Sequence, residues 1–544
     1  MLNPCLPRPP GEGITMITMM APLIMALAPG MEPTRDPVAR AIDKAISGAN
    51  PAFAREASGP CDDLAFLRRV SLDLIGRTPT VAEARAFASA GGAKRADAVE
   101  RLLSHPDFNW YWAQVLDTWW MERRPSKNVE TSLWMAYLRE SLEASKPVDI
   151  LISEIVSADG VDPAQRGRAR FLLDREMEPV LVTRDISRLF LGANLQCAQC
   201  HDHPRIEGYK QEHFHGLMAY LNRAYLFDDP KLKKKVIGEK ADGDVTFQSV
   251  FDPKKVTKKR APGLPGASER ADPMVSKEQL YVSAPSKEVR GVPKYSRRLL
   301  LGEDLKGAGR EALARNMANR LWAQLTGKGL IHPLDQIHPH NPASCETLME
   351  SLTSSVISAK FDLKAMLRGI ALSEAYQRSS VGKPGIKGAE ERFLAARLRP
   401  LSPEQMGYSM LVATGFDDAE AGAAPKALQA KREGAGKMFI SALAPPAGNP
   451  DMFEPRLEQS LLMSNHPQVQ SLLASRKGNL AFRLAAAKDA EAVAEELYLA
   501  MFCRLPDADE KADVAKALQG ADKPTAIADL IWALISSAEF RFIS

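Results

Sequence analysis

Two cysteines and a histidine stand at the spacing that attaches a c-type haem. Residues 197–201 form the C-x-x-C-H motif, with Cys197, Cys200 and His201 at its three defined positions. Two thiols three positions apart lie on one helical turn, where both can add to the vinyl groups of one haem. The following histidine then supplies the proximal nitrogen of the iron. The sequence therefore predicts one covalent haem c, with His201 as the iron ligand.

The same spacing allows other chemistry. A redox disulfide of the thioredoxin type uses C-x-x-C, but the βαβ pattern that surrounds such motifs is absent from the flanking sequence. A structural disulfide between Cys197 and Cys200 would suit an oxidising compartment. The cysteine pair could also hold a zinc ion together with His201, His203, His213 or His215. Zinc is thus the alternative cofactor, and a disulfide is the alternative without one.

Candidates for a second axial ligand follow the motif closely. His203 comes two residues after His201, too near to reach the opposite face of a haem without an unusual loop. Residues 212–221 are predicted to form a helix on which His215 and Met218 lie one turn apart. The predicted cofactor-binding side chains are therefore His203, His215 and Met218 beside the motif itself, and a five-coordinate iron is the alternative.

A second group of histidines lies in the stretch GLIHPLDQIHPHNP, at His332, His338 and His340 with Asp335 between them. Three prolines force turns there, and the spacing fits no known set of metal ligands. We expect this stretch to form a loop that packs against the first half of the chain.

Charge and motif content exclude several functions. Lys and Arg total 71 against 67 Asp and Glu, a net charge of +4 over 544 residues, so charge gives no support for nucleic-acid binding. The phosphate-binding loop, the dinucleotide fingerprint and the usual hydrolase motifs are absent. Whether the protein is an enzyme stays open at this point.

The N-terminal stretch predicts export. Residues 14–28 form an apolar run after Arg8, a length that suits a signal peptide and is short for a membrane-spanning helix. We therefore expect residues 1–36 to be a leader and the protein to reach the periplasm or cell envelope. A disordered apolar tail is the alternative. No later segment is long and apolar enough to predict a transmembrane span.

Apolar residues at spacings of three and four predict a mainly α protein. The pattern is clear over residues 62–75 and again over residues 312–325. We expect two helical domains, residues 37–225 with the cysteine motif and residues 294–544, joined by residues 226–293.

The connecting stretch, residues 226–293, differs in composition from the helical regions on either side of it. Lysines cluster at residues 231–235 and 254–260, and prolines recur up to residue 293. Alternation on both sides of Asp242-Gly243-Asp244 predicts a β-hairpin that turns there. The lysines are interpreted as a solvated surface rather than as a binding patch.

Longer strings resemble two known families. FLRRVSLDLIGRTPT (66–80) and the stretch around the cysteine motif (188–221) resemble the planctomycete cytochrome-C-like domain. The stretches 314–342 and 361–380 resemble the planctomycete surface domain, its usual partner. The resemblance implies an exported cell-envelope protein. Both families are of unknown function, and the cytochrome label depends on the same cysteine motif.

Three functional hypotheses follow. In the first, the protein carries one haem c and transfers electrons to a redox or envelope protein partner. In the second, it is a non-catalytic envelope protein whose cysteine motif binds a metal or forms a disulfide. In the third, it is an enzyme whose haem activates a substrate, as in a peroxidase. Attached haem would separate the second hypothesis from the other two, and an open distal face would favour the third.

Overall fold

The structure is a computed structural model that describes residues 36–420, 422–447, 457–519 and 522–544. Within these residues helices carry almost all of the fold, and strands pair only in two-stranded antiparallel sheets. The prediction of a mainly α protein is confirmed. The predicted leader lies outside the described residues except for Asp36. No described helix is long and apolar enough to cross a membrane.

The first half of the chain is a run of short helices whose ends follow local sequence signals. The side chain of Asp62 caps the third helix, and Gly76 ends it in the left-handed conformation. Thr80 and Glu83 form a capping box on the next helix. The elements are α1 (Pro37–Ala49), α2 (Phe53–Glu56), α3 (Asp63–Ile75), α4 (Val81–Ser89), α5 (Lys94–Leu103), α6 (Pro106–Met121), α7 (Thr131–Glu143), α8 (Val148–Ser157), η1 (Pro163–Ala169), α9 (Arg170–Leu173), α10 (Pro179–Phe190), η2 (Gln196–Gln199) and α11 (Gln211–Met218).

The connecting stretch contains three small hairpins. Strand β1 (Ala224–Asp229) pairs with β2 (Lys234–Glu239), β3 (Val245–Phe247) with β4 (Lys258–Arg260), and β5 (Tyr281–Ser283) with β6 (Val292–Pro293). A short 3-10 helix, η3 (Lys277–Gln279), precedes β5.

The hairpin predicted around Asp242-Gly243-Asp244 is wrong in its pairing. The two strands that flank this turn, β2 and β3, belong to different sheets. Strand β2 instead turns back onto β1, where Asp229 accepts hydrogen bonds from the backbone N–H groups of Lys231 and Leu232. Alternation marks a half-buried strand but does not identify the strand that pairs with it.

The second half returns to helices. A long helix, α13, ends at Gly327, which has a φ of 86°. The elements are α12 (Arg297–Lys306), α13 (Arg310–Thr326), α14 (Glu346–Ser358), α15 (Leu363–Leu372), α16 (Glu374–Gln377), β7 (Arg399–Pro400), α17 (Pro403–Ala413), α18 (Phe416–Ala419), α19 (Pro425–Leu443), α20 (Leu457–Asn465), α21 (Pro467–Leu473), α22 (Leu480–Ala485), α23 (Ala490–Phe502), α24 (Ala508–Gln519), α25 (Lys523–Ser536), α26 (Ala538–Arg541) and β8 (Phe542–Ile543).

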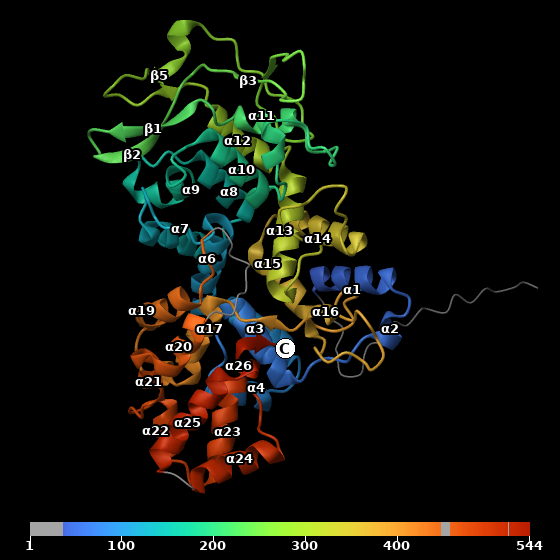
Figure 1. Cartoon of the computed structure of the whole chain (residues 1–544), viewed down its shortest axis with the longest axis vertical. Helices are drawn as coiled ribbons and strands as arrows, with labels where there is room; N and C mark the ends of the chain where they lie inside the picture. The colour runs from blue at the N-terminus through green and yellow to red at the C-terminus, as the bar shows by residue number, and fades with distance from the viewer. Residues whose placement is uncertain (1–35, 421, 448–456, 520–521) are drawn as a thin grey trace, which may run out of the picture.

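The two halves of the chain share one hydrophobic core. Trp112 of α6 and Trp322 of α13 belong to the same buried apolar cluster. Helix α1 packs against α14 and α15, and α4 packs against α23. Figure 1 shows α3 and α4, drawn in blue, among the red helices at the other end of the chain. The first helices are thus built into the second half of the molecule.

Helix α3 is hydrogen-bonded to the last residues of the chain. The Arg68 guanidinium donates to the backbone oxygens of Phe542 (2.7 Å) and Phe540 (3.0 Å). Nε of Arg69 donates to the backbone oxygen of Ser544 at 2.9 Å. Backbone carbonyls that would otherwise be buried without partners are satisfied in this way.

A buried charge junction joins α6 to the second half. We use this name for Asp107, Arg77 and Arg432. The Asp107 carboxylate accepts from Nε of Arg77 and from Nη1 of Arg432, each at 2.9 Å, and also from the Gln429 amide at 3.0 Å. Burial alone would raise the pKa of Asp107, but the two guanidinium charges hold it well below its ordinary value.

Candidate functional site

The cysteine motif lies on an exposed turn, residues 196–203, which we call the cysteine turn. After α10 ends, Gly192 reverses the chain with a φ of 70°, and η2 begins at Gln196. Ala198 is fully buried in a small apolar cluster with Leu195, Ile206, Tyr209 and Phe214. Because Ala198 faces inward, Cys197 and Cys200 on either side of it are exposed, and both thiols are free.

Side chains from α11 hold this turn in place. Nε2 of His215 donates to the backbone oxygen of Gln199 at 3.0 Å. The backbone N–H of Gln211 donates to Oδ1 of Asp202 at 2.7 Å. On the other side, the backbone N–H of Val250 donates to the backbone oxygen of Cys200 at 3.1 Å. The Gln211 amide also donates to the Gln199 oxygen, at 3.3 Å. The turn is therefore held from both sides, although its two thiols are open to solvent.

The imidazole of His201 is oriented for a metal or a haem iron. Its Nδ1 lies 2.7 Å from the backbone oxygen of Asp202. A carbonyl oxygen only accepts hydrogen bonds, so Nδ1 carries the hydrogen and Nε2 keeps a lone pair. A ligating histidine in proteins usually donates its other ring N–H to such a carbonyl. The geometry thus leaves Nε2 of His201 available as a ligand atom.

His203 has its lone pair engaged. Its Nδ1 accepts from the backbone N–H groups of Arg205 (3.2 Å) and Ile206 (3.0 Å), and its ring lies edge-on to Tyr209. This arrangement closes the turn that follows the motif. A ligand role for His203 stays a prediction, and the hydrogen bonds show instead a part in shaping the turn.

His215 and Met218 lie below the turn rather than in the open. The His215 ring is buried and stacks on Phe247, with ring centroids 4.3 Å apart. Burial lowers the pKa of His215, and the hydrogen bond to Gln199 opposes this only in part. Its Nδ1 is buried without a partner. Met218 packs against the small apolar cluster. Their ligand roles likewise stay predictions.

The residues present fit a covalent haem. Two free, exposed thiols and a histidine with an available Nε2 are the donor set that a haem c requires. Two apolar side chains beside them, Val250 and Phe251, are 66% and 74% exposed, and the Phe251 ring centroid lies 4.7 Å from that of His201. Over the described parts of the chain, no three His, Cys, Asp or Glu side chains are placed to hold a metal ion.

The helix before the motif, α10, packs its apolar residues into the main core. Ile186, Leu189 and Phe190 recur on it at helical spacing, and all three are buried there. The Phe190 ring packs against Trp120 and Phe171.

The loop that carries His332, His338 and His340 packs against the first half of the chain, as predicted. The backbone N–H of Ile337 donates to the backbone oxygen of Gly192 at 2.8 Å, and that of Asn194 to the backbone oxygen of Asp335 at 2.9 Å. A Cβ at Gly192 would lie 2.4 Å from Cδ1 of Ile337, so a larger residue would have to displace the Ile337 side chain and adopt a strained positive φ. The His338 ring lies 5.4 Å from Tyr209, between centroids.

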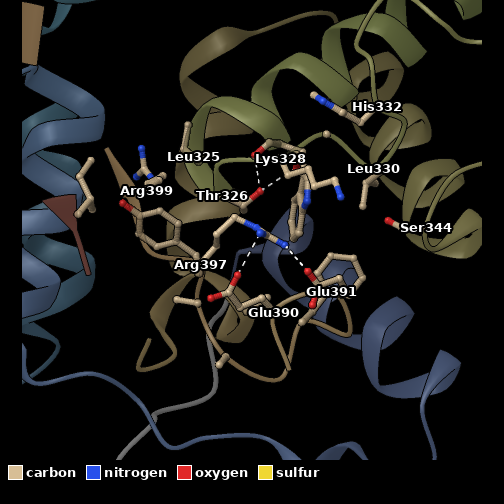
Figure 2. A pocket seen from close by; sticks show the side chains of 18 of the residues that line it. Leu325, Thr326, Lys328, Leu330, His332, Ser344, Glu390, Glu391, Arg397 and Arg399 are labelled. Carbon is tan, nitrogen blue, oxygen red and sulfur yellow. Dashed lines mark hydrogen bonds and ion pairs between the residues drawn. The ribbon is translucent and has the colours of Figure 1, made fainter. Parts of the chain in front are cut away.

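A cavity of about 240 Å³ is a second candidate site. Figure 2 shows it with Arg397 paired to Glu390 and Glu391, each at 3.0 Å. Arg399 at its edge is paired with the buried carboxylate of Asp73. Trp322, Leu325 and Leu330 are among the apolar residues that line it. Since these charged groups are already paired with one another, the cavity points to no particular ligand.

A larger cavity of about 400 Å³ lies beside it and shares Lys328, Gly329, His332 and Arg399 with the first. It is lined by α6, α13 and the start of α17, including Trp119 and Met406. None of the predicted haem-binding residues lines either of these two cavities. The cysteine turn is therefore a surface site.

The sequence interpretation missed Val250, Phe251 and Gln211. Gln211 holds the turn through its backbone N–H, which donates to Oδ1 of Asp202, and through its side-chain amide, which donates to the backbone oxygen of Gln199 at 3.3 Å. The same amide donates to the backbone oxygen of Gln248 at 3.0 Å. No local pattern distinguishes these residues, because their roles depend on contacts with residues that are not their neighbours in the sequence. An isolated aromatic residue between charged stretches is the only signal that could have indicated Phe251.

Comparison with known families confirms the resemblance. Residues 41–225 match the family model PSCyt2, described as a protein of unknown function. Residues 297–438 match the family model PSD1, which carries the same description. The two matches follow in the order that the sequence indicated, with the cysteine turn inside the first. No curated protein and no solved structure matches the chain.

Proposed function

The chain belongs to the PSCyt2 and PSD1 families, in that order along the sequence, and on this premise we propose that it is an exported envelope protein that carries one covalent haem c. Its role is electron transfer to a redox partner. Cys197 and Cys200 attach the group, and Nε2 of His201 is the proximal ligand. The families themselves have no assigned function.

The observation that carries the proposal is the hydrogen bond from Nδ1 of His201 to the backbone oxygen of Asp202. It fixes the tautomer and the direction of the ring next to two free, exposed thiols. A histidine kept for stability alone would have no need of an open Nε2 beside a cysteine pair.

A bound haem would supply a one-electron carrier at the protein surface. The surrounding residues would hold the attachment site in place and provide apolar surface beside it. Hydrogen bonds from His215 and Val250 to the turn hold the two thiols at constant positions. Val250 and Phe251 offer apolar surface that a macrocycle would cover. Nδ1 of His203 accepts backbone hydrogen bonds, Nε2 of His215 donates to the Gln199 oxygen, and Nδ1 of His215 is buried, so these three nitrogens would not be offered to a bound haem.

The test is expression of the full chain in a host with c-type maturation, followed by intact mass and a pyridine haemochrome spectrum. We expect a mass gain of one haem and a c-type spectrum. The variants Cys197→Ala and Cys200→Ala should each lose one thioether bond. Cys345→Ala is the matched control, because Cys345 is partly exposed and lies outside the motif, and among the described residues its thiol hydrogen-bonds only Thr347.

His201→Ala separates attachment from ligation. We expect haem still bound through the thioethers, with a Soret band shifted by loss of the proximal nitrogen. An apo mass in the parent chain, with either a Cys197–Cys200 disulfide or bound zinc, would replace the haem proposal by the non-catalytic alternative.

Export is tested separately. Fractionation of cells should place the chain outside the cytoplasm when residues 1–36 are present and inside when they are removed. Equal distribution of both forms would contradict the proposed location.

A further inference from the structure

Residues 248–260 form a strongly basic loop directly beside the cysteine turn. We call this segment the basic loop. It holds five basic residues and one acidic residue, a formal charge of +4 within thirteen residues, equal to the net charge of the whole chain. The sequence alone indicated a solvated surface. Its position in the fold changes that interpretation.

The basic loop is ordered by its own hydrogen bonds and is joined to the cysteine turn. Asp252 accepts from the backbone N–H groups of Lys254 (2.9 Å) and Val256 (3.3 Å). The Gln248 amide donates to Oγ1 of Thr257 at 2.6 Å. The bond from the Val250 N–H to the Cys200 oxygen fixes the loop against the motif. The positions of its charges are therefore fixed relative to the two thiols.

Three of its lysines have no carboxylate partner in the part of the chain that the structure describes: Lys254, Lys255 and Lys258. The other two basic residues are neutralised, Lys259 by Asp244 at 2.6 Å and Arg260 by Glu269. All three unpaired lysines are exposed. Their charge is thus available to an anionic surface.

An apolar centre lies among these charges. Phe251 (74% exposed) contacts the His201 ring, and Val250 (66% exposed) adjoins the Cys200 backbone. A small apolar centre with a charged rim is the usual anatomy of a protein interface. Weak electron-transfer contacts are small interfaces of this kind, and charge complementarity steers their encounter.

We propose that the basic loop and the cysteine turn form one docking surface for an acidic protein partner. Phe251 and Val250 make its centre, and Lys254, Lys255 and Lys258 make its rim. The purpose of the contact, electron exchange, rests on the proposed function, whereas the contact itself does not require haem.

The probe for the test is a fluorescently labelled acidic ferredoxin, chosen for its strongly negative surface. Its binding to the full chain is measured by anisotropy at low and at physiological salt. We expect the triple variant Lys254→Glu, Lys255→Glu, Lys258→Glu to weaken binding at least about tenfold at low salt. Phe251→Ser should weaken it about threefold or more, with an unchanged salt dependence.

Two controls match these changes. The triple variant Lys231→Glu, Lys233→Glu, Lys234→Glu makes the same change of charge on the exposed tip of the β1–β2 hairpin. Phe482→Ser alters an exposed aromatic residue far along the chain. Both controls should change the affinity less than about twofold. Equal loss in both triple variants, or no salt-dependent binding of the ferredoxin, would overturn the proposal.

A second probe distinguishes a membrane from a protein. Vesicles of phosphatidylcholine with phosphatidylglycerol should bind no more tightly to the parent chain than to the loop variant. Binding of vesicles in preference to ferredoxin would replace the proposed partner by an anionic lipid surface. The same assays on Cys197→Ser/Cys200→Ser keep the two hypotheses apart. Unchanged docking by this variant supports a contact that does not require haem, and loss of docking would overturn the docking surface as proposed. The proposed function is tested by the mass and the haemochrome spectrum of the parent chain.

Discussion

The buried charge junction pairs its charged side chains with one another, whereas the cysteine turn leaves its two thiols exposed. At the junction, Asp107 is 4% exposed, and its carboxylate accepts hydrogen bonds from the side chains of Arg77, Arg432 and Gln429. On the cysteine turn, the stabilising side chains bond to backbone atoms, and the reactive groups Cys197, Cys200 and His201 are left at the surface.

The junction therefore contributes mainly to the stability of the fold, whereas the cysteine turn presents the groups that could react. Removing one member of a buried charge network leaves the other charges buried and uncompensated, so the cost is large. Removing a side chain that holds an exposed turn releases only that turn. The predictions below test this contrast, beginning with the largest expected effect.

Asp107→Ala should lower the free energy of unfolding by about 3–5 kcal/mol, because two buried guanidinium groups lose their carboxylate. Chemical denaturation measures this directly. Asp513→Ala, at an exposed position of α24, should change it by less than about 0.5 kcal/mol. Similar losses in both variants would mean that the buried junction contributes no more to the free energy of unfolding than an exposed carboxylate does.

Gly192→Ala should cost roughly 2 kcal/mol, since the new Cβ would meet Cδ1 of Ile337 at 2.4 Å and the backbone has positive φ. Ile337→Ala should restore part of the loss in the double variant by making room. Thermal unfolding of the two single variants and the double variant provides the comparison. Additive losses would show that the contact between the two halves is not the cause.

Asp43→Asn should alter the pH dependence of stability. Burial, and to a smaller extent the charge of Glu374, raises the pKa of Asp43 to about 7 from its ordinary 3.8. The folded state therefore binds a proton more tightly than the unfolded state, and stability falls as pH rises from about 4 to about 7.

Asparagine keeps the acceptor for the Glu374 N–H, 2.8 Å away, without the charge. At pH 8 the variant should be more stable than the parent by about 1–3 kcal/mol, a value reduced for partial exposure of the side chain. The gain should shrink as pH is lowered toward 5. Thermal melts across this range give the answer, and a constant difference would refute the assigned pKa.

His215→Phe should have the smallest effect on global stability, about 1 kcal/mol, because the stacked ring is kept and one hydrogen bond is lost. Its local effect should be larger. Without the bond from His215 to the Gln199 oxygen, the turn opens more often. The backbone N–H of Val250, which donates to the Cys200 oxygen, should then exchange its hydrogen with solvent about threefold faster. Unchanged rates would mean that the bonds from Gln211 and Val250 are enough.

The sequence predicts the helix caps and the cysteine motif, but it does not predict the contacts between residues that lie far apart in the chain. The caps of α3 and α4 and the C-x-x-C-H motif are local signals, and each marks its element within a few residues. The pairing of β2 with β1 and the approach of Phe251 to His201 depend on residues brought together by the fold. The joining of α3 to β8 has no local signature either, because Arg68 donates to backbone carbonyls, which every residue possesses.

The bonds that Arg68 and Arg69 make have a consequence for biosynthesis. Their partners lie more than 470 residues further along the chain. At about 5–20 residues per second, α3 leaves the ribosome roughly half a minute to a minute and a half before those carbonyls are made. During that time the first helices lack part of their native packing surface. A holding chaperone that binds nascent helices α1–α5 would therefore act on this protein before any other part of it is complete.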